Sequence, residues 1–372
     1  MRIALGVLLG LHGLIHLAGF AKAFALVDLA TLTQPISRPV GLLWLFAGAA
    51  MITTALLPWR LLWIVGLLAL TTSQVAIVTS WADARFGTLP NVVLLLAVVY
   101  GFAARGPLSL PAGYAADTTR ILHGARPGPV VTEADLTPLP APVQRYLRTS
   151  GAVGQPRPGS VRVRWRGRIR AGAADPWMPL TAEQVNTYGP SPSRLFLLAA
   201  TMKGVPVAVY HRFIGAAATF RVRLLSLLPI IDARGPEMNR AETVTLFNDL
   251  CVLAPGRLVD PAIRWEPIDD THARATFTRG DQTISAELRF DPSGMLVDFV
   301  SDDRARASAD GATFTPARWS TPLAAPRGYG RYQLASRGEA RWHEPGDPGP
   351  GYAYIELELL AYQVEPAATS AR

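Results

Sequence analysis

The hydrophobic positions divide the chain into two parts with different periods. Roughly the first 105 residues contain four almost continuous apolar runs, at 3–25, 39–57, 61–80 and 89–104. Each run is close to the ~20 residues that an α-helix needs to cross a bilayer. A secretory signal peptide would explain the first run alone, but two histidines inside it favour a retained helix. The pattern therefore predicts a transmembrane domain of four helices over residues 1–105.

The period changes after the last apolar run. Residues 106–158 are rich in proline and glycine, which predicts a linker with one short helix at PAPVQRYLRTSG. From residue 159 the period is two, as in VRVRWRGRIR, where apolar residues alternate with arginines. Roughly ten such runs follow in series, and TRGDQ and DPSG provide hairpin turns. An antiparallel sheet, strongly curved or a half-barrel, is expected over residues 159–366.

One helix is expected to interrupt the strands, over residues 237–253. Pro236 suits the first helical position, and Pro255 with Gly256 follows the last turn. The predicted fold class is thus a membrane α-helical anchor joined to a mainly-β domain of the α+β type, in which one helix packs on a curved antiparallel sheet. Aromatic side chains expected on the concave face are Trp165, Phe196, Phe220 and Phe277.

Several segments resemble an uncharacterised bacterial family. They are ARGPEMNRAETVTLFND, LTPLPAPVQRYLRTSG, RWEPIDDTHARATF and WADARFGTLPN. Some members of that family resemble this chain in having a membrane anchor, and others consist of the β-rich domain alone. The resemblance implies no activity and therefore no catalytic residues. More distantly, the meandering strands with an inserted helix are similar to the half-barrel of the LolA/LolB-type lipoprotein carriers, which is a likeness of fold.

The net charge of +8 does not indicate a nucleic-acid partner. Lys22 and Lys203 are the only lysines, and this excess of arginine fits GC-rich coding as well as it fits a polyanion. Aromatic residues do not interleave with the arginines of 162–170 as stacking platforms would. That row of arginines either faces anionic lipid headgroups or, in the preferred interpretation, is neutralised by Glu356 and Glu358 of the last strand.

His12 and His16 lie four residues apart in the first apolar run, which brings them to ~6 Å on one helix face. Polar groups at that depth are functional or hydrogen-bonded to a neighbouring helix. Candidate partners are Thr53, Thr54, Ser73 and Gln74. Structural hydrogen bonding is the preferred interpretation, and a quinone, haem or metal site is the alternative. A second face of this helix, which lets a neighbouring helix approach closely, carries Gly6, Gly10 and Gly13.

Polar residues cluster around the predicted helix of the β domain. The candidate ligand-binding residues are Arg234, Glu237, Asn239, Glu242 and Asp249, together with Trp165. Glu237 also complements the positive end of the helix dipole. Glu242 and Asp249 lie two turns apart, ~10 Å along the axis, so they are not expected to share a proton or a metal unaided. A buried ion pair or ordinary solvation is preferred for them over a ligand or catalytic role.

These features predict a noncatalytic, membrane-anchored protein that binds a lipid or another apolar small molecule. A nucleophile elbow, a P-loop, a GxGxxG after a strand, HExxH and CxxC are all missing, and Cys251 alone forms neither an internal disulfide nor a Cys-based zinc site. No cofactor is assigned. One alternative is an integral-membrane redox enzyme with a cofactor at the histidine pair, and another is a scaffold or sensor whose β domain binds a protein.

The expected location is the cell membrane, with several passes. Arg120 and Arg126 tip the balance of flanking positive charge, so the β domain is expected on the cytoplasmic side.

Overall fold

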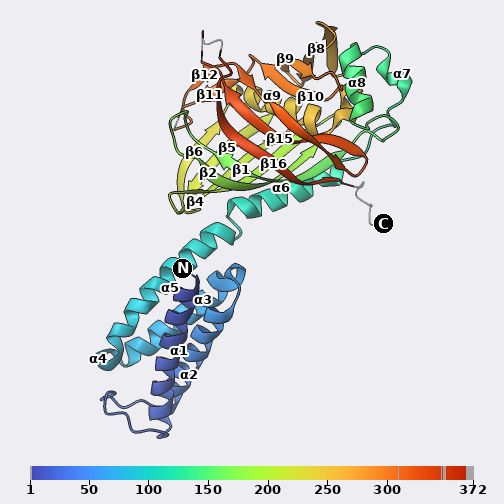
Figure 1. Ribbon diagram of the computed structural model, residues 1–372. Coiled ribbons are helices and arrows are strands. Elements are labelled where there is room, and N and C mark those ends of the chain that lie inside the picture. The colour runs from blue at the N-terminus through green and yellow to red at the C-terminus, as the bar shows by residue number, and fades with distance from the viewer. Residues whose placement is uncertain (1, 309, 345, 347–348, 366–372) are drawn as a thin grey trace. The chain divides into compact units, whose positions relative to one another are not determined.

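The computed structural model describes residues 2–308, 310–344, 346 and 349–365. The chain forms two compact units, which divide between Ala112 and Gly113 (Figure 1). Residues 1 and 366, which bound the domains expected from the sequence, lie outside the described residues.

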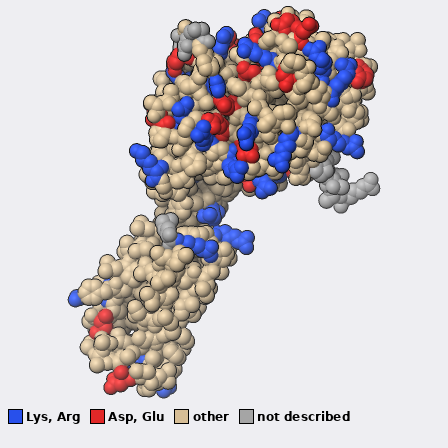
Figure 2. Space-filling model, viewed as in Figure 1, with Lys and Arg blue, Asp and Glu red and all other residues tan. Residues whose placement is uncertain are grey.

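The first unit is a bundle of helices that follow the four apolar runs. Its elements are α1 (Arg2–Ala23), α2 (Arg38–Leu56), α3 (Trp59–Thr79), α4 (Trp81–Ala84), the 3-10 turn η1 (Arg85–Gly87) and α5 (Thr88–Arg105). By length and composition, four helices of the described chain are apolar enough to cross a membrane. Leu9, Met51 and Leu94 are fully buried between them. Figure 2 shows few charged residues over this unit.

Helices α1 and α2 pack through glycines. A Cβ atom placed on Gly13 would lie 3.0 Å from the carbonyl oxygen of Gly48, and one placed on Gly48 would lie 2.8 Å from the carbonyl oxygen of Gly13. Only glycine therefore fits at either position. Gly13 therefore makes the close helix approach expected from the glycine face of the first helix, and a Cβ atom placed on Gly6 would lie 3.4 Å from the carbonyl oxygen of Ala55. Gly10 does not take part, because no described atom lies within 4 Å of a Cβ atom placed there.

The segment expected to be a linker differs in the structure. Helices α6 (Leu110–Gly124), α7 (Glu133–Leu136) and α8 (Ala141–Thr149) occupy much of it, whereas the sequence indicated only the last. The side chain of Asp117 in α6 accepts hydrogen bonds from the Tyr210 hydroxyl and the Arg212 guanidinium, both at 2.8 Å. Tyr114 packs edge-on against Tyr210, with ring centroids 5.9 Å apart. Tyr114 and Asp117 lie three residues apart, on one face of α6, and their contacts hold this helix against β4. The composition of the segment alone is typical of a loop.

The second unit contains one long antiparallel sheet. Its strands are β1 (Ser160–Ile169), β2 (Met178–Thr187), β3 (Ser193–Met202), β4 (Val205–Ile214), β5 (Ala217–Leu224), β6 (Leu228–Arg234), β7 (Ile263–Pro267), β8 (His272–Arg279), β9 (Gln282–Phe290), β10 (Leu296–Ser301), β13 (Trp319–Ser320), β14 (Leu323–Tyr329), β15 (Tyr332–Trp342) and β16 (Tyr352–Val364). The described strands follow the order β6-β5-β4-β3-β2-β1-β16-β15-β13-β10-β9-β8-β7, and β14 pairs with β15. A separate hairpin consists of β11 (Ala305–Ala307) and β12 (Phe314–Pro316).

Strands β1 and β16, the first and last along the chain, lie side by side in the sheet. Their outer faces carry opposite charges. Arg166 donates to Glu358 at 2.8 Å, and Arg168 donates to Glu356 at 2.7 Å. The arginine row is therefore neutralised across strands, as the preferred interpretation of the sequence expects. Figure 2 likewise shows basic and acidic residues mixed over the visible face of the unit.

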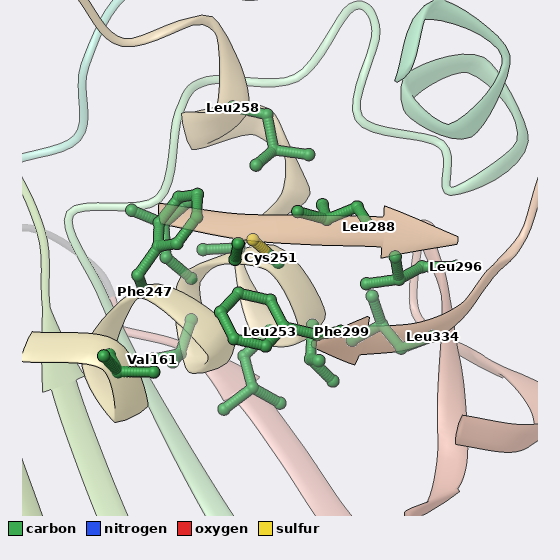
Figure 3. Close-up of a cluster of buried hydrophobic side chains, with 14 of the residues drawn as sticks. Val161, Phe247, Cys251, Leu253, Leu258, Leu288, Leu296, Phe299 and Leu334 are labelled. Carbon is green, nitrogen blue, oxygen red and sulfur yellow. The ribbon is translucent and has the colours of Figure 1, made fainter. Parts of the chain in front are cut away.

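Helix α9 (Pro236–Leu253) packs inside the curve of the sheet (Figure 1). Every residue from Ala241 to Leu253 is buried, which is unusual for a helical stretch that contains two carboxylates. Phe247 stacks on Phe277 with ring centroids 4.9 Å apart, and Figure 3 shows Phe247 and Cys251 among apolar side chains from the sheet. The turn η2 (Pro255–Val259) follows the helix. The expected fold class, a half-barrel curled around one helix, is confirmed.

Candidate functional site

A cavity of about 430 Å³ lies between α9 and the sheet. This volume falls within the range of about 300–1,000 Å³ that small-molecule sites occupy. The residues of α9 that line the cavity recur about every three or four positions, which shows that they belong to one face of the helix. They are Met238, Ala241, Glu242, Thr245, Asn248, Asp249, Val252 and Leu253.

The walls that the sheet contributes are mainly apolar. They include Trp165, Leu198, Val209, Phe220, Ile355 and Leu357. Trp165 and Phe220 are two of the aromatic residues expected on the concave face, and Phe196 also lines the cavity. Phe277 instead packs against α9 and is not part of the lining.

A buried ion cluster closes one part of the cavity. Arg194 of β3 donates through Nε to Asp249 at 2.6 Å and through Nη1 to Glu242 at 3.2 Å. All three residues are at least nine-tenths buried. A single guanidinium thus bridges the two carboxylates, which lie two helical turns apart and cannot meet directly. The buried ion pair preferred from the sequence is present, and its cation comes from a distant strand.

Side-chain amides complete the bonding of Asp249. Gln184 and Asn186 of β2 donate to the same carboxylate oxygen, at 2.6 and 3.1 Å. The indole nitrogen of Trp165 donates to the Gln184 side-chain oxygen at 2.9 Å, which fixes the amide's orientation. Because three donors converge on one oxygen of this carboxylate, the Asp249 side chain is ordered and that oxygen is occupied.

His211 of β4 bonds to the other carboxylate. Its Nδ1 lies 3.2 Å from Glu242 Oε1. Burial lowers the pKa of the His211 imidazole, and the Glu242 carboxylate opposes this effect only in part, so the ring is neutral at pH 7. Burial raises the pKa of Glu242, but the His211 ring, which is protonated in acid, and the Arg194 guanidinium outweigh this effect and bring the value to about 2. At neutral pH, Arg194 is therefore the cation that keeps Glu242 ionised.

The pKa of Glu242 makes the stability of the second unit depend on pH. The value falls from an ordinary 4.5 to about 2 on folding, so the stabilising contribution is complete above pH 4.5 and is lost as the pH falls toward 2. We expect this loss to be on the order of 3 kcal/mol. Unfolding of the wild type and of Glu242→Gln, measured from pH 5 to pH 2.5, should show their stability difference shrinking steadily. A difference that stays constant over this range would contradict the assignment.

A second cation, Arg304, lines another part of the cavity. It is 9% exposed, and its guanidinium carbon lies 4.3 Å from the ring centroid of Trp319 and 5.4 Å from that of Trp342. Its Nη1 donates to the Tyr354 hydroxyl at 3.4 Å, and its Nε is buried without a hydrogen-bond partner among the described residues. All four residues line the cavity. Arg304 therefore lies in an aromatic enclosure next to the cavity.

The structure brings together only some of the residues that the sequence indicated. Trp165, Glu242 and Asp249 lie at the cavity. The remaining three candidates have other positions and partners: Arg234 is exposed and bonds to Asp232, Glu237 is exposed at the start of α9, and Asn239 accepts a hydrogen bond from the backbone of Ala218.

The remaining polar residues of the site carried a weak sequence signal or none. Gln184 and Asn186 follow Leu180 and Ala182 on the same face of β2. The two-residue period therefore does place these amides on the buried face. Arg194 shares the two-residue period of Phe196 and Leu198 in β3, so the alternation places it on the inner face without indicating its carboxylate partners. His211 and Arg304 carry no clearer signal, because only long-range strand pairing brings their partners to them.

The histidine pair belongs to a separate hydrogen-bond network within the first unit. Ser73 Oγ lies 3.2 Å from His12 Nε2 and 2.7 Å from His16 Nε2, and it donates to Asn91 at 3.0 Å. Asn91 in turn donates to Gln74. This network joins three helices and supports the structural interpretation of the pair. A cofactor at this position stays a hypothesis, and the described residues contain no group of three or more metal-ligating side chains.

Comparison with known proteins identifies the family. Residues 129–355 match a group described as "Family of unknown function (DUF6544)". The chain belongs to this family. The match covers α8, most of the sheet and α9, so the expected resemblance to an uncharacterised family is confirmed. The description of the family gives no activity and assigns no role to any residue. No curated protein matches the chain.

Two solved structures are distantly similar. One, from Vibrio parahaemolyticus, is described as an outer membrane lipoprotein-sorting protein domain; it is 12% identical, with a TM-score of 0.33, and the match covers 57% of this chain and 88% of that one. The other is a DUF1329 family protein from Desulfovibrio piger, 11% identical, with a TM-score of 0.34 and coverage of 63% and 96%. The half-barrel assignment rests on this chain's own sheet and helix.

Proposed function

We propose that this protein is a membrane-anchored, noncatalytic binding protein whose half-barrel takes up a lipid or another apolar molecule. The observation that carries the proposal is the cavity of about 430 Å³ whose walls are mainly apolar. An apolar molecule that fills this cavity would contact the apolar lining on several sides, and such dispersion contacts are collectively large.

The bonding of the polar cluster favours binding over catalysis. Both oxygens of Glu242 have partners, and one oxygen of Asp249 accepts three hydrogen bonds. A general base needs a lone pair that can reach the substrate, and a carboxylate saturated by protein donors offers none at that oxygen. The cluster therefore acts as a rigid, polar end of the cavity.

The surface of the first unit supports membrane anchoring. Large apolar side chains are more than half exposed along its helices, among them Ile3, Leu14, Ile15, Leu42 and Ile64. Burying such surface in hydrocarbon gains roughly 25 cal/mol per Å² relative to water. A bilayer provides that environment over the whole length of the helices. The cytoplasmic placement of the β domain stays a prediction.

The direct test is ligand content and uptake. Full-length protein purified from membranes should contain copurifying lipid beyond the detergent-exchangeable fraction. In phosphatidylcholine nanodiscs it should also show saturable energy transfer from tryptophan to a fluorescent fatty acid, relative to empty nanodiscs. Protein without bound lipid and without any saturable signal would disprove the proposal.

Filling the cavity should abolish uptake. Ala241 is 3% exposed and lies on the face of α9 that lines the cavity, so the side chain introduced by Ala241→Phe would occupy ligand space. We expect the affinity for the fluorescent fatty acid to fall at least about tenfold, with a loss of stability of about 1–3 kcal/mol. Ala262→Phe, on an exposed residue, is the matched control and should bind normally. Equal affinity of the two variants would show that the ligand binds elsewhere.

A further inference from the structure

We propose that the cavity binds a single-chain amphiphile by its anionic head, a carboxylate or a phosphate, and that Arg304 receives this head. The inference rests on the proposed function, because it names the class of ligand for the same cavity. It is carried by a buried guanidinium that borders the cavity without a carboxylate partner.

The other well-buried arginines of the second unit have anionic partners, and Arg304 differs from them. Arg194 is paired with Glu242 and Asp249, and Arg257 is paired with Asp260 at 3.3 Å. No ion pair joins Arg304 to any carboxylate in the part of the chain that the structure describes. The charge of Arg304 helps to lower the pKa of Glu242 from a longer distance, but no described carboxylate contacts it. The buried guanidinium therefore lacks a direct counter-ion and its Nε donor is unfilled, and both are unfavourable. A ligand anion would remove both penalties.

The surroundings of Arg304 orient it for such a ligand. The Trp319 ring lies 4.3 Å from the guanidinium carbon and limits the space in which the guanidinium can move. A planar guanidinium presents its N–H groups as a fork that matches carboxylate and phosphate oxygens. The Tyr354 hydroxyl oxygen accepts from Arg304 at 3.4 Å and from the Trp319 indole at 3.2 Å. Its own proton has no acceptor among the described residues, so it can be donated to a ligand oxygen.

Much of the remaining cavity wall suits an alkyl chain, although Arg306, Arg337 and Glu339 also belong to the lining. Arg194 is already bonded to two carboxylates, so it does not compete for the anionic head. Apolar side chains from the sheet and from α9, such as Phe220, Val252 and Leu357, form much of the remaining lining. A molecule with one anionic end and one apolar chain would therefore match both parts of the cavity.

The test measures headgroup discrimination in the full-length protein. The probes are cis-parinaric acid and its methyl ester, which share a chain and differ in charge, and dodecanoate and dodecyl phosphate serve as competitors. Wild-type protein in phosphatidylcholine nanodiscs should bind the acid about tenfold or more tightly than the ester, since bonds to charged groups are the stronger ones. The competitor that displaces the acid at the lower concentration distinguishes a carboxylate head from a phosphate head.

Three variants separate the possible roles of Arg304. Arg304→Gln should reduce the preference for the acid to about twofold or less, because it weakens binding of the acid much more than binding of the ester. Arg304→Lys keeps the charge but loses the fork, and it should give an intermediate preference. Arg164→Gln removes one exposed positive charge from β1 and should behave as the wild type. A thermal melt of each variant verifies folding.

The outcomes separate this inference from the proposed function. If both probes bind saturably but Arg304→Gln and Arg304→Lys keep the full preference for the acid, Arg304 serves only to balance the Glu242–Asp249 cluster, and the inference is overturned. If neither probe binds the wild type saturably, the proposed function itself fails. A wild type that binds acid and ester equally also overturns the inference and leaves apolar binding intact.

Discussion

Replacing Arg194 with methionine is expected to destabilise the second unit by about 3–5 kcal/mol. The substitution removes the one cation that bonds to both Glu242 and Asp249, while the apolar stem is largely conserved. Two carboxylates would then remain buried with amides and a neutral imidazole as partners. Because breaking a buried pair costs far more than the intact pair contributes, the effect should be among the largest of any single substitution in this unit.

The measurement is the thermal midpoint of the full-length protein, followed by near-ultraviolet circular dichroism. A loss of 3–5 kcal/mol corresponds to a decrease of roughly 6–20 °C for a unit of this size. Arg166→Met is the matched control, because Arg166 forms an exposed pair with Glu358 and should change the midpoint little. Equal shifts in the two variants would contradict the role given to Arg194.

A combined variant tests the reason for this effect. Glu242→Gln and Asp249→Asn remove the two buried negative charges and keep groups that can hydrogen-bond. Added to Arg194→Met, they should restore part of the lost stability, since the cost arises from uncompensated charge. If the triple variant is less stable than Arg194→Met alone, packing rather than charge explains the first result.

The sequence predicts the architecture well because the architecture depends on local periodicity. The alternation in 161–170 places Val161, Val163 and Trp165 on the buried face, and the structure buries all three. The turn signals TRGDQ and DPSG connect β8 to β9 and β9 to β10. Helix α6 was missed because its stability comes from contacts with β4, which local composition does not reveal.

The site is predicted only in part, because its bonds join residues far apart in the chain. The sequence places Glu242 and Asp249 on a predicted helix, where they can be recognised as candidate site residues. Arg194 lies in a run whose pattern predicts a strand and indicates no partner for it. Arg194 is 55 residues from Asp249, and only the folding of the sheet around α9 brings its guanidinium to that carboxylate. Arg304 follows two aspartates in SDDRARA, where a solvated loop is the natural interpretation. Its burial depends on strands that pair later in the chain.

Truncation of Phe247 should produce a second large loss of stability, without the dependence on charge. Phe247 is fully buried, stacks on Phe277 and meets Phe299 edge-on at 5.7 Å between ring centroids (Figure 3). Phe247→Ala would leave a cavity on the side of α9 that packs against β8 and β10, which rigid strands cannot fill. We expect a loss of about 3–5 kcal/mol, measured as a lower thermal midpoint at both pH 7 and pH 4.

Phe220→Ala provides the matched comparison, because Phe220 is only partly buried and lines the ligand cavity. Its truncation should cost less stability than that of Phe247 but weaken uptake of an apolar probe, since it removes wall atoms that a ligand would contact. Phe247→Ala should show the reverse pattern at temperatures where it remains folded. If both variants lose stability and binding in the same proportion, core and cavity are not independent, and the ligand would then have to be an integral part of the folded half-barrel.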